Sequence, residues 1–467
     1  MKILHYALGF PPYRTGGLTK YCIDLMLTQA EQGHEVALLW PGRITIVKKK
    51  PEIHKGRNWN GIESFEIINP LPVPLDEGIL DVDAYIKKGD ETVYSKFLQD
   101  YSPDVIHIHT LMGLHKEFIH AANELGIRTV FTTHDYFGLC PKVTLFHNGK
   151  PCDNDHNCMD CVKCNQSALS LKKIVVLQSP VYRKLKNTRV VKLLRSRHRK
   201  NFFEEAETET AASAENTNVA QNQNYEKLRE YYVSMLKMID FIHFNSSVTE
   251  MIYNRYFHPK NSAVISITHR DIKDHRKRKN FDHDVLRITY LGPAKPFKGF
   301  QFLIGVLDDI WRETPGKFEL HIYTNTNVER EYITHKQEGY PYSQLEEIFD
   351  NTDLLIAPSQ WYETFGFTVL EALSYGVPVM VTDSVGAKDI VCNISPELVL
   401  SGDKFGLKKL DLRSINRKIM NSETIIKTEL AHEKYMKNKK YWLIGSGSSS
   451  CRRMMADLEN VQIHDFE

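Results

Sequence analysis

The sequence predicts an α/β protein made of two wound domains, and three observations support this fold class. Short apolar runs rich in β-branched residues alternate with longer segments of helical periodicity. The alternation restarts after a charged stretch, residues 269–283. The 467 residues are enough for roughly two to four domains. Alternation of this kind implies parallel strands joined by right-handed crossovers.

The first half of the chain is predicted to consist of β-α-β units. Gly16-Gly17 separates the first strand from the first helix, and Gly33 precedes the second strand. The expected strands cover residues 2–8, 34–40, 104–109, 128–133 and 241–244, and the expected helices cover 18–32, 115–125, 225–238 and 246–256. We therefore expect one domain over residues 1–268, with a parallel sheet as its centre.

An insertion is predicted at about residues 140–225, because the alternation fails there. A cysteine cluster opens it, and residues 163–203 then hold twelve Lys and Arg but no Asp or Glu. Residues 204–224 are acidic and then polar, which is typical of a solvated connection.

The second half repeats the pattern of the first, after a predicted linker at residues 269–285. The expected strands cover residues 286–291, 318–323, 354–357 and 378–382, and the expected helices cover 299–311, 344–350 and 368–375. These elements predict a second domain over 286–440, followed by a tail, residues 441–467, that begins near the flexible segment GSGSSS. Two such domains place a ligand cleft between the carboxyl ends of their sheets.

The composition excludes some classes of protein but identifies no partner. There are 60 Lys and Arg against 58 Asp and Glu, a net charge of +2, and 42% of the residues are hydrophobic. This balance is typical of a soluble enzyme. No apolar run approaches the roughly 18 residues of a membrane span, and the apolar start breaks at Pro11-Pro12. We expect a cytoplasmic protein.

The segment 352–389 is the most informative part of the sequence. Glu363 and Gly366 lie in a loop after a predicted strand, and Glu371 follows in a helix. The amides of Phe365, Gly366 and Phe367 would then lie at a helix N-terminus, which favours a phosphate. Glu371 would accept ribose hydroxyls, and Glu363 would reach the group on the distal phosphate. The alternative is an ordinary helix with two surface acids.

Three further positions fit the same cleft. Gly16-Gly17 would let the backbone approach a phosphate, although such a pair is more often a simple turn. Lys298 precedes a helix and could direct its ammonium at the phosphates, and alone it is a surface lysine. His134 ends a predicted strand at the carboxyl edge of the first sheet, where a histidine is otherwise most often structural.

In this order the segments resemble those of a known family. LHYALGFPPYRTGGLTKYCIDL, PDVIHIH, TTHDY, YLGPAKPFKGF and APSQWYETFGFTVLEALSYGVPV are similar to segments of family 4 glycosyltransferases of the bacterial surface-polysaccharide type. The resemblance covers roughly residues 1–140 and 226–400. It implies the GT-B fold, in which two Rossmann-like domains face each other across a cleft, and a retaining transfer from a nucleotide-diphosphate sugar.

The resemblance also implies a role for each candidate residue. It assigns Glu363 and His134 to the donor sugar, Glu371 to the ribose, Lys298 to the diphosphate, and Gly16 and Gly17 to the diphosphate from the opposite domain. The family usually has Arg after the glycine at Gly292, where this chain has Pro293. Lys295 is the candidate that would replace the missing charge.

The chemistry implied by the resemblance needs no catalytic metal. Lys298 and the amides of residues 365–367 would stabilise the leaving diphosphate. In front-face retention a phosphate oxygen accepts the proton of the acceptor, so the carboxylate pair of a glycosidase is not required. The Asp-x-Asp pairs at residues 81–83 and 153–155 are interpreted as chance occurrences.

Five cysteines within 25 residues predict a structural zinc site. Cys158 and Cys161 have the spacing of a chelating pair, and Cys140 and Cys152 would complete a tetrahedral set, with Cys164 as a substitute ligand. The segment H-D-x-x-x-x-C-P resembles relatives with a similar cluster. Free thiols remain the alternative, because the two distal spacings do not match a standard zinc finger.

The basic stretch 182–200 places apolar residues on one helical face among nine Lys and Arg. Such a helix can lie on an anionic membrane, and a basic helix packed against its own domain is the alternative. Without a reader motif or interleaved aromatic residues, nucleic acid is not an expected partner.

Three functions are compatible with these features of the sequence. The leading hypothesis is a glycosyltransferase that acts at the inner membrane face on a lipid-linked or surface-polysaccharide acceptor. A non-hydrolysing epimerase would use the same cleft without an acceptor. A zinc-stabilised regulatory or binding protein on a degenerate transferase scaffold would bind no nucleotide sugar.

Overall fold

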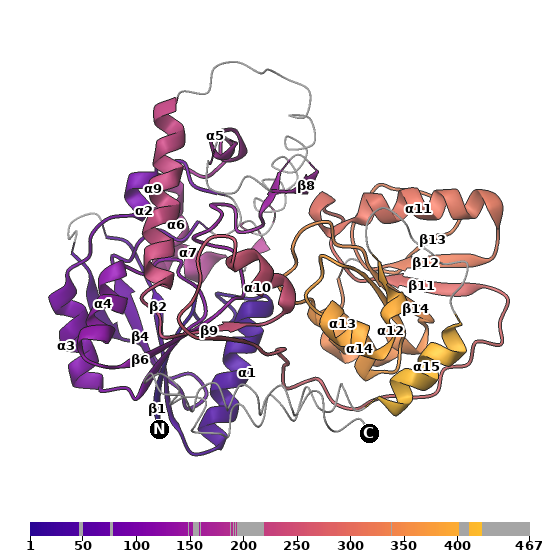
Figure 1. Ribbon diagram of the computed structural model, residues 1–467, viewed down its shortest axis with the longest axis horizontal. Coiled ribbons are helices and arrows are strands. Elements are labelled where there is room, and N and C mark those ends of the chain that lie inside the picture. The colour runs from indigo at the N-terminus through magenta and orange to yellow at the C-terminus, as the bar shows by residue number, and fades with distance from the viewer. Residues whose placement is uncertain are drawn as a thin grey trace.

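The computed structural model contains two large sheets, one mainly and one wholly parallel, each with its own helices, side by side in the molecule (Figure 1). We call them the N-lobe and the C-lobe. The structure describes residues 1–45, 50–74, 78–147, 149–152, 158, 160–186, 188–189, 191, 193, 219–337, 339–400 and 411–422. The predicted tail and residues 204–218 lie outside these ranges.

The N-lobe sheet has eight strands in the order β10-β9-β6-β5-β1-β2-β4-β3. All neighbouring strands are parallel except β3 and β4. The strands are β1 (Lys2–Tyr6), β2 (Glu35–Pro41), β3 (Glu52–Lys55), β4 (Glu63–Ile68), β5 (Val105–Ile108), β6 (Arg128–Thr132), β9 (Phe241–Phe244) and β10 (Ser262–Val264).

Helices cover this sheet and bury their apolar sides on it. They are α1 (Gly17–Glu31), α2 (Val82–Tyr85), α3 (Glu91–Tyr101), α4 (Lys116–Glu124), α9 (Val219–Leu236) and α10 (Ser247–Tyr253). The insertion contributes the short helices α5 (Cys161–Cys164), α6 (Leu171–Leu177) and α7 (Pro180–Leu185), and a hairpin of β7 (Phe146–His147) and β8 (Lys150–Pro151). In Figure 1, α5 and β8 lie beyond the upper end of the N-lobe sheet.

The C-lobe sheet is wholly parallel, with the order β13-β12-β11-β14-β15-β16. Numbered along the chain this is 3-2-1-4-5-6, the doubly wound order of nucleotide-binding folds. The strands are β11 (Leu286–Tyr290), β12 (Phe318–Ile322), β13 (Ile333–His335), β14 (Leu354–Ala357), β15 (Val379–Thr382) and β16 (Val399–Leu400). The predicted α/β class with parallel sheets is confirmed in both lobes.

Helices again connect the strands of the C-lobe. They are η2 (Pro296–Lys298), α11 (Phe300–Glu313), η3 (Tyr342–Gln344), α12 (Leu345–Asp350), α13 (Phe367–Ser374), α14 (Lys388–Ile394), η4 (Pro396–Leu398) and α15 (Leu412–Asn421). Because α13 follows β14 directly, its N-terminus lies at the carboxyl edge of the sheet, where ligands bind in this architecture.

Two parts of the chain differ from the sequence prediction. No element was assigned to residues 41–103, yet β3, β4, α2 and α3 all lie there. The edge strand β3 has no buried residue, and only half of the residues of its neighbour β4 are buried, so the apolar signal of both is weak. The helix that was expected from residue 225 begins earlier, because α9 already starts at Val219, within the stretch that was predicted to be a connection.

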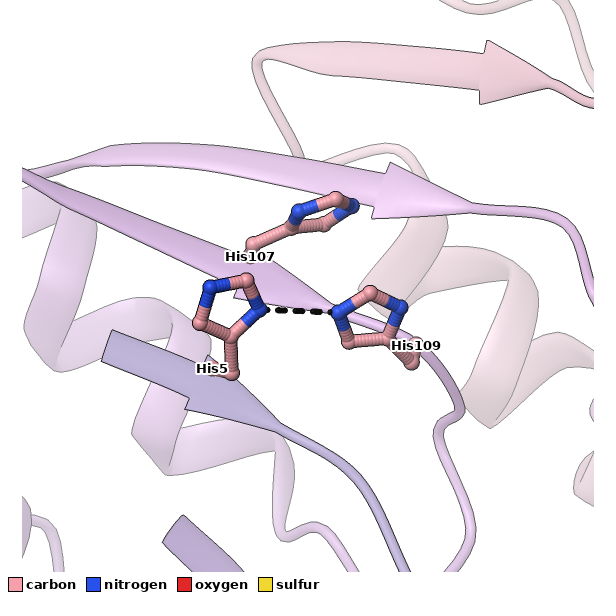
Figure 2. Close-up of side chains that lie close together, drawn as sticks. All are labelled: His5, His107 and His109. Atoms are coloured by element: carbon pink, nitrogen blue, oxygen red, sulfur yellow. Dashed lines mark hydrogen bonds between the residues drawn. The ribbon is translucent and has the colours of Figure 1, made fainter. Parts of the chain in front are cut away.

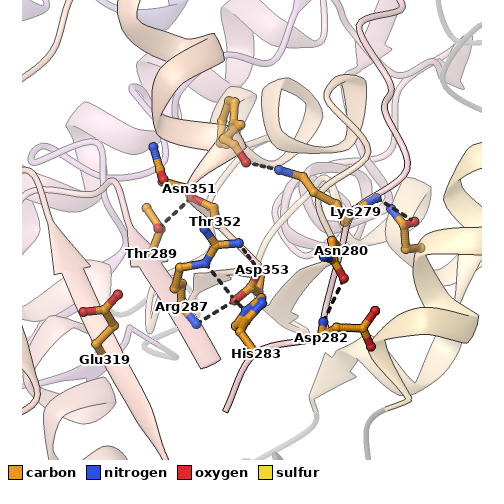
Figure 3. A network of polar contacts seen from close by, with 12 residues as sticks. Lys279, Asn280, Asp282, His283, Arg287, Thr289, Glu319, Asn351, Thr352 and Asp353 are labelled. Atoms are coloured by element: carbon orange, nitrogen blue, oxygen red, sulfur yellow. Dashed lines mark hydrogen bonds and ion pairs between the residues drawn. The ribbon is translucent and has the colours of Figure 1, made fainter. Parts of the chain in front are cut away.

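The charged linker is anchored at its C-terminal end by a polar network (Figure 3). The side chain of Asp353 is fully buried and accepts from Arg287 Nη2 at 2.7 Å and from His283 Nε2 at 2.7 Å. Burial alone would raise the pKa of Asp353, but the bonds from Arg287 and His283 lower it below its usual value. The network therefore fixes the approach to β11 against the start of β14.

Among the described residues, no helix combines the length and the apolar character that are needed to cross a lipid bilayer.

Candidate functional site

The loop between β14 and α13 carries the charged centre of the candidate site. Lys298, the last residue of η2, forms an ion pair from Nζ to Oε1 of Glu363 at 2.6 Å. The hydroxyl of Ser359 donates to the other carboxylate oxygen of Glu363. The side chains of Lys298 and Glu363 are 21% and 17% exposed, so both reach the surface while their partners hold them in place. The two predicted residues are thus brought together.

Two glycines explain how these loops approach each other. Gly299, at φ +72°, lies so close to the end of β14 that a Cβ atom would collide with the carbonyl oxygen of Pro358. Gly366 adopts φ +101° as the N-cap residue of α13, a conformation that L side chains rarely adopt. The sequence therefore brings η2 against the 358–366 loop and turns the chain into α13.

The N-terminus of α13 has the features of an anion site. No side chain caps this helix, and its first turn has no acidic residue. Within the described residues, the amides of Gly366 and Phe367 donate to no protein acceptor. Free amides and the helix dipole both favour a negative group at this position.

The two predicted glycines of the N-lobe lie directly opposite this helix. A Cβ atom on Gly17 would meet the ring of Phe367 at 3.5 Å, and one on Gly16 would meet nothing within 4 Å. Gly16 has φ +115° and is the N-cap residue of α1, which also has no side-chain cap. Two helix N-termini from different lobes thus face the same space.

Glu371 lies within α13 and is only 4% exposed, so it is not a surface acid. Its Oε1 contacts Nε2 of His269 at 3.2 Å, and the ring of Tyr342 packs edge-on against the ring of His269. Burial, with the added charge of Glu371, raises the pKa of Tyr342. His269 and Tyr342 were not among the predicted site residues, because nothing local in the sequence pairs a linker histidine with a helix 102 residues later.

His134 follows β6 at the carboxyl edge of the N-lobe sheet and is half-buried. Its backbone carbonyl accepts from the hydroxyl of Thr364 in the C-lobe at 3.1 Å. The hydroxyl of Ser246 donates to the carbonyl of Thr364 at 2.7 Å. Burial lowers the pKa of His134 to about 3, so the imidazole is neutral at physiological pH. The predicted histidine therefore lies beside the loop that carries Glu363.

Pro293 and Lys295 lie in the loop after β11, and Lys295 is not part of the ion pair with Glu363. The carbonyl of Pro293 accepts from the hydroxyl of Tyr290 at 2.8 Å and from the amide of Lys295 at 2.7 Å. The ammonium of Lys295 lies 5.2 Å from the centre of the Phe297 ring. Lys298, and not Lys295, is the lysine that pairs with Glu363.

The cysteine segment packs against α9. Cys140 and Cys158 line a small cavity together with Arg229. Arg229 is 8% exposed, and among the described residues its Nη1 has no hydrogen-bond partner. Its Nε donates to the carbonyl of Leu139 at 3.0 Å, so the buried guanidinium has one unsatisfied nitrogen beside the cysteines. Such a cation fits a thiolate-rich centre, because several thiolates on one metal carry net negative charge.

The convergence of four thiols on one point stays a prediction. In the described part of the chain, the groups of three or more ligand-type side chains within 4.8 Å are His5, His107 and His109, and Asp24, His269 and Asp271. Neither group includes a cysteine.

Two cations of the basic stretch 182–200 contact the domain that carries it, while large apolar residues nearby are exposed. Arg183 pairs with Glu66 at 3.0 Å and stacks over Trp40, and Lys186 donates to the carbonyl of Tyr13 at 2.6 Å. These two cations hold the insertion on its own domain. By contrast, large apolar residues are exposed in this stretch and just before it, namely Val176, Val181, Leu185 and Leu193. The remaining basic residues from 194 to 203 lie outside the described residues.

Both halves of the chain match family models of sugar-transferring enzymes. Residues 15–151 match the model described as Glycosyltransferase Family 4, and residues 271–402 match the model described as Glycosyl transferases group 1. The first match ends within the cysteine segment, after Cys140 and before Cys152, and the second covers the whole loop of Glu363 and helix α13.

One relative in sequence and two solved structures are also similar to this chain, and the structures show the same fold. An uncharacterized 42.6 kDa protein in the cps region of Klebsiella pneumoniae is 22% identical over 94% of this chain and 99% of its own. A structure described as OtsA apo is similar with a TM-score of 0.52 at 11% identity, over 94% of this chain and 99% of its own. A structure described as trehalose-6-phosphate from E. coli bound with UDP-2-fluoro glucose has a TM-score of 0.53 at 11% identity, with the same coverage.

Proposed function

Because this chain is a family 4 glycosyltransferase of the GT-B fold, we propose that it transfers a sugar, with retention, from a nucleotide-diphosphate sugar to a lipid-linked or surface-polysaccharide acceptor. The observation that carries this proposal is the charged pair of Lys298 and Glu363 beside the free amides of Gly366 and Phe367. A cation and a helix N-terminus side by side suit a diphosphate.

The diphosphate lies between the two lobes in this proposal. Lys298 and the amides of Gly366 and Phe367 bind it from the C-lobe, and the exposed backbone of Gly16 and Gly17 binds it from the N-lobe. These donors are fixed before the reaction, so they stabilise the negative charge that develops on the leaving diphosphate. Lys295, two residues after Pro293, adds a second cation on the same loop.

The sugar and the ribose lie on opposite sides of that diphosphate. Glu363 accepts hydroxyls of the donor sugar, and Lys298 and Ser359 keep its carboxylate oriented. His134 faces the same sugar from the N-lobe. Glu371, held by His269, accepts the ribose hydroxyls. The acceptor gives its proton to the departing phosphate oxygen, so no residue acts as a nucleophile in this scheme.

The acceptor is the less constrained part of the proposal. The Klebsiella pneumoniae relative in the cps region supports a surface-polysaccharide acceptor. The exposed Val176, Val181 and Leu185 beside the exposed Lys172 and Lys173 support docking on an anionic membrane face, where apolar contacts and basic charge act together.

The cysteine segment holds a structural zinc ion in this proposal. Cys140, Cys152, Cys158 and Cys161 are its ligands, and Arg229 offsets the negative charge of the thiolates. The ion stabilises the insertion and takes no part in the transfer.

A thermal-shift panel of UDP-, ADP- and GDP-sugars tests the donor. A ligand at 100 times its Kd stabilises the native state by roughly 2.7 kcal/mol, so the true donor raises the melting temperature. The same panel with Lys298→Ala shows whether the shift depends on the proposed site. If no nucleotide sugar stabilises the wild-type chain, the donor assignment is wrong. Product analysis with the stabilising donor then tests retention.

A further inference from the structure

The N-lobe contains a cluster of histidines that the proposed reaction does not use directly. His5, His107, His109 and His243 are each 0% exposed, and His134 continues the cluster toward the cleft. His5 and His107 are paired in register on the neighbouring strands β1 and β5, so their side chains lie on the same face of the sheet. Buried imidazoles of this kind need hydrogen-bond partners.

Three of these histidines form a continuous chain of hydrogen bonds that begins on helix α1. Oε1 of Gln29 lies 2.7 Å from Nε2 of His5. Nδ1 of His5 lies 3.0 Å from Nε2 of His109, the bond drawn in Figure 2. Nδ1 of His109 lies 3.3 Å from Nε2 of His134. The chain thus crosses the sheet strand by strand, from β1 past β5 to β6, and ends at the proposed sugar site.

The polarity of this chain follows from its first member. The amide oxygen of Gln29 can only accept, so Nε2 of His5 carries the proton. Burial lowers the pKa of His5 to about 4 and that of His109 further, so both rings are neutral and each has one N–H. Nδ1 of His5 therefore accepts from His109, and Nδ1 of His109 accepts from His134.

We propose that Gln29, His5 and His109 are positioning residues that hold His134 in the tautomer with Nε2 protonated and Nδ1 free to accept a hydrogen bond. The inference rests on the proposed function in one respect, the contact of His134 with the donor sugar. In that contact His134 accepts a hydrogen bond from a sugar hydroxyl and orients it. It does not donate a proton to the leaving group.

Two rings of this hydrogen-bonded chain, His5 and His109, could be considered part of a metal site together with His107, because one nitrogen of each lies within 4.8 Å of the others. Two observations favour the relay. The ring of His107 packs over that of His109, with centroids 4.1 Å apart and an angle of 31°, and its Nε2 contacts Thr132 at 2.7 Å. Both nitrogens of His5 are engaged, so an ion would have to replace the proton between His5 and His109.

Imidazole nitrogen NMR on the full chain tests the tautomer without any ligand. Protonated and unprotonated imidazole nitrogens resonate at well-separated frequencies, and the His134→Gln spectrum assigns the signals of His134. In the wild type we expect a protonated Nε2 and a bare Nδ1 on His134. In Gln29→Leu, which removes the anchoring acceptor, we expect a mixture of both tautomers. Gln29→Glu keeps an acceptor oxygen and should restore the single tautomer.

Kinetics with the nucleotide sugar that stabilises the wild type form the second arm. We expect Gln29→Leu to lower kcat/KM by roughly three- to tenfold, the effect of one hydrogen bond of ordinary strength, and Gln29→Glu to recover most of it. His115→Leu is the matched control. It also breaks a buried histidine bond, at 2.6 Å to the hydroxyl of Tyr94, but lies outside the relay. It should lower stability and leave kcat/KM unchanged.

The relay is wrong if His134 carries its proton on Nδ1 in the wild type, or if its signals are the same in Gln29→Leu. Stoichiometric metal that is lost with His5→Asn would also overturn it, in favour of a metal site. A failure of the proposed function gives a different result. In that case the tautomer is as expected, but His134→Gln turns over the donor as fast as the wild type.

Discussion

The side-chain hydroxyl of Thr364 donates a hydrogen bond of 3.1 Å to the backbone carbonyl of His134. This bond joins the loop of Glu363 in the C-lobe to the histidine at the carboxyl edge of the N-lobe sheet. Ser246 contacts the carbonyl of the same threonine from the N-lobe, so Thr364 is held on two sides. The relative position of the two halves of the site thus depends on a residue that contacts no substrate in the proposed mechanism.

We expect Thr364→Val to lower kcat/KM by roughly three- to tenfold, because it removes one hydrogen bond between the lobes without changing the size of the side chain. Thr364→Ser, which keeps the hydroxyl, should retain most of the activity. Steady-state kinetics of both variants check this. Equal activity of Thr364→Val and wild type would show that the bond does not help to assemble the site.

Lys298→Ala is expected to lower kcat by about 10²–10³, as for other lost electrostatic stabilisers of a developing charge. The variant also leaves Glu363 without its partner at 2.6 Å. Lys317→Ala is the control, since Lys317 is exposed on the same lobe. Turnover numbers at saturating donor are the measurement, and a normal kcat for Lys298→Ala would exclude a role in the chemical step.

Glu371→Ala is expected mainly to raise the donor KM, since a ribose contact is the same in the ground and transition states. The structure adds a second effect. The buried His269 loses its partner, so the free energy of unfolding should fall by about 1–3 kcal/mol.

Donor titrations and thermal unfolding separate these two effects of Glu371→Ala. Glu347→Ala, at an exposed acid on α12, should change neither quantity. If the KM of Glu371→Ala equals that of the wild type, Glu371 serves only the fold.

The purified, reduced protein is expected to contain close to one zinc ion, and the double substitution Cys158→Ser and Cys161→Ser should abolish it. Because metal binding and folding are coupled, the insertion should also become more sensitive to proteolysis. Cys392→Ser, at an exposed cysteine of the C-lobe, is the control. Metal analysis of fresh protein without zinc would leave the free-thiol alternative.

Binding to vesicles is expected to rise with their content of anionic lipid and to fall with salt, as the Debye length shortens from about 10 Å at 0.1 M to about 3 Å at 1 M. Lys172→Glu with Lys173→Glu and Val181→Ser should weaken it and leave donor binding intact. Lys87→Glu with Lys88→Glu, also exposed, is the control. Loss of donor binding together with vesicle binding would mean that the stretch belongs to the fold.

Much of the fold could be predicted from the sequence because its signals are local. Buried parallel strands such as β5 and β14 appear as short apolar runs, and Gly366 and Gly376 mark the ends of α13. The strands β3 and β4 were missed, since the edge strand β3 and its neighbour β4 are only partly buried and lack that signal. The candidate residues Lys298 and Glu363 were found from their positions in loops, but not their ion pair, because they are 65 residues apart.

The sequence by itself determined the α/β class, the two-domain order and the residue types at the strand ends, because hydrophobic periodicity and glycine positions act over a few residues. Tertiary structure alone decided which side chains meet. His269 leaves a charged linker to hold Glu371, and Gln29 on α1 reaches His5, which contacts His109. These contacts depend on how strands distant in sequence are ordered and paired in register, and that order is fixed only when the whole sheet is packed.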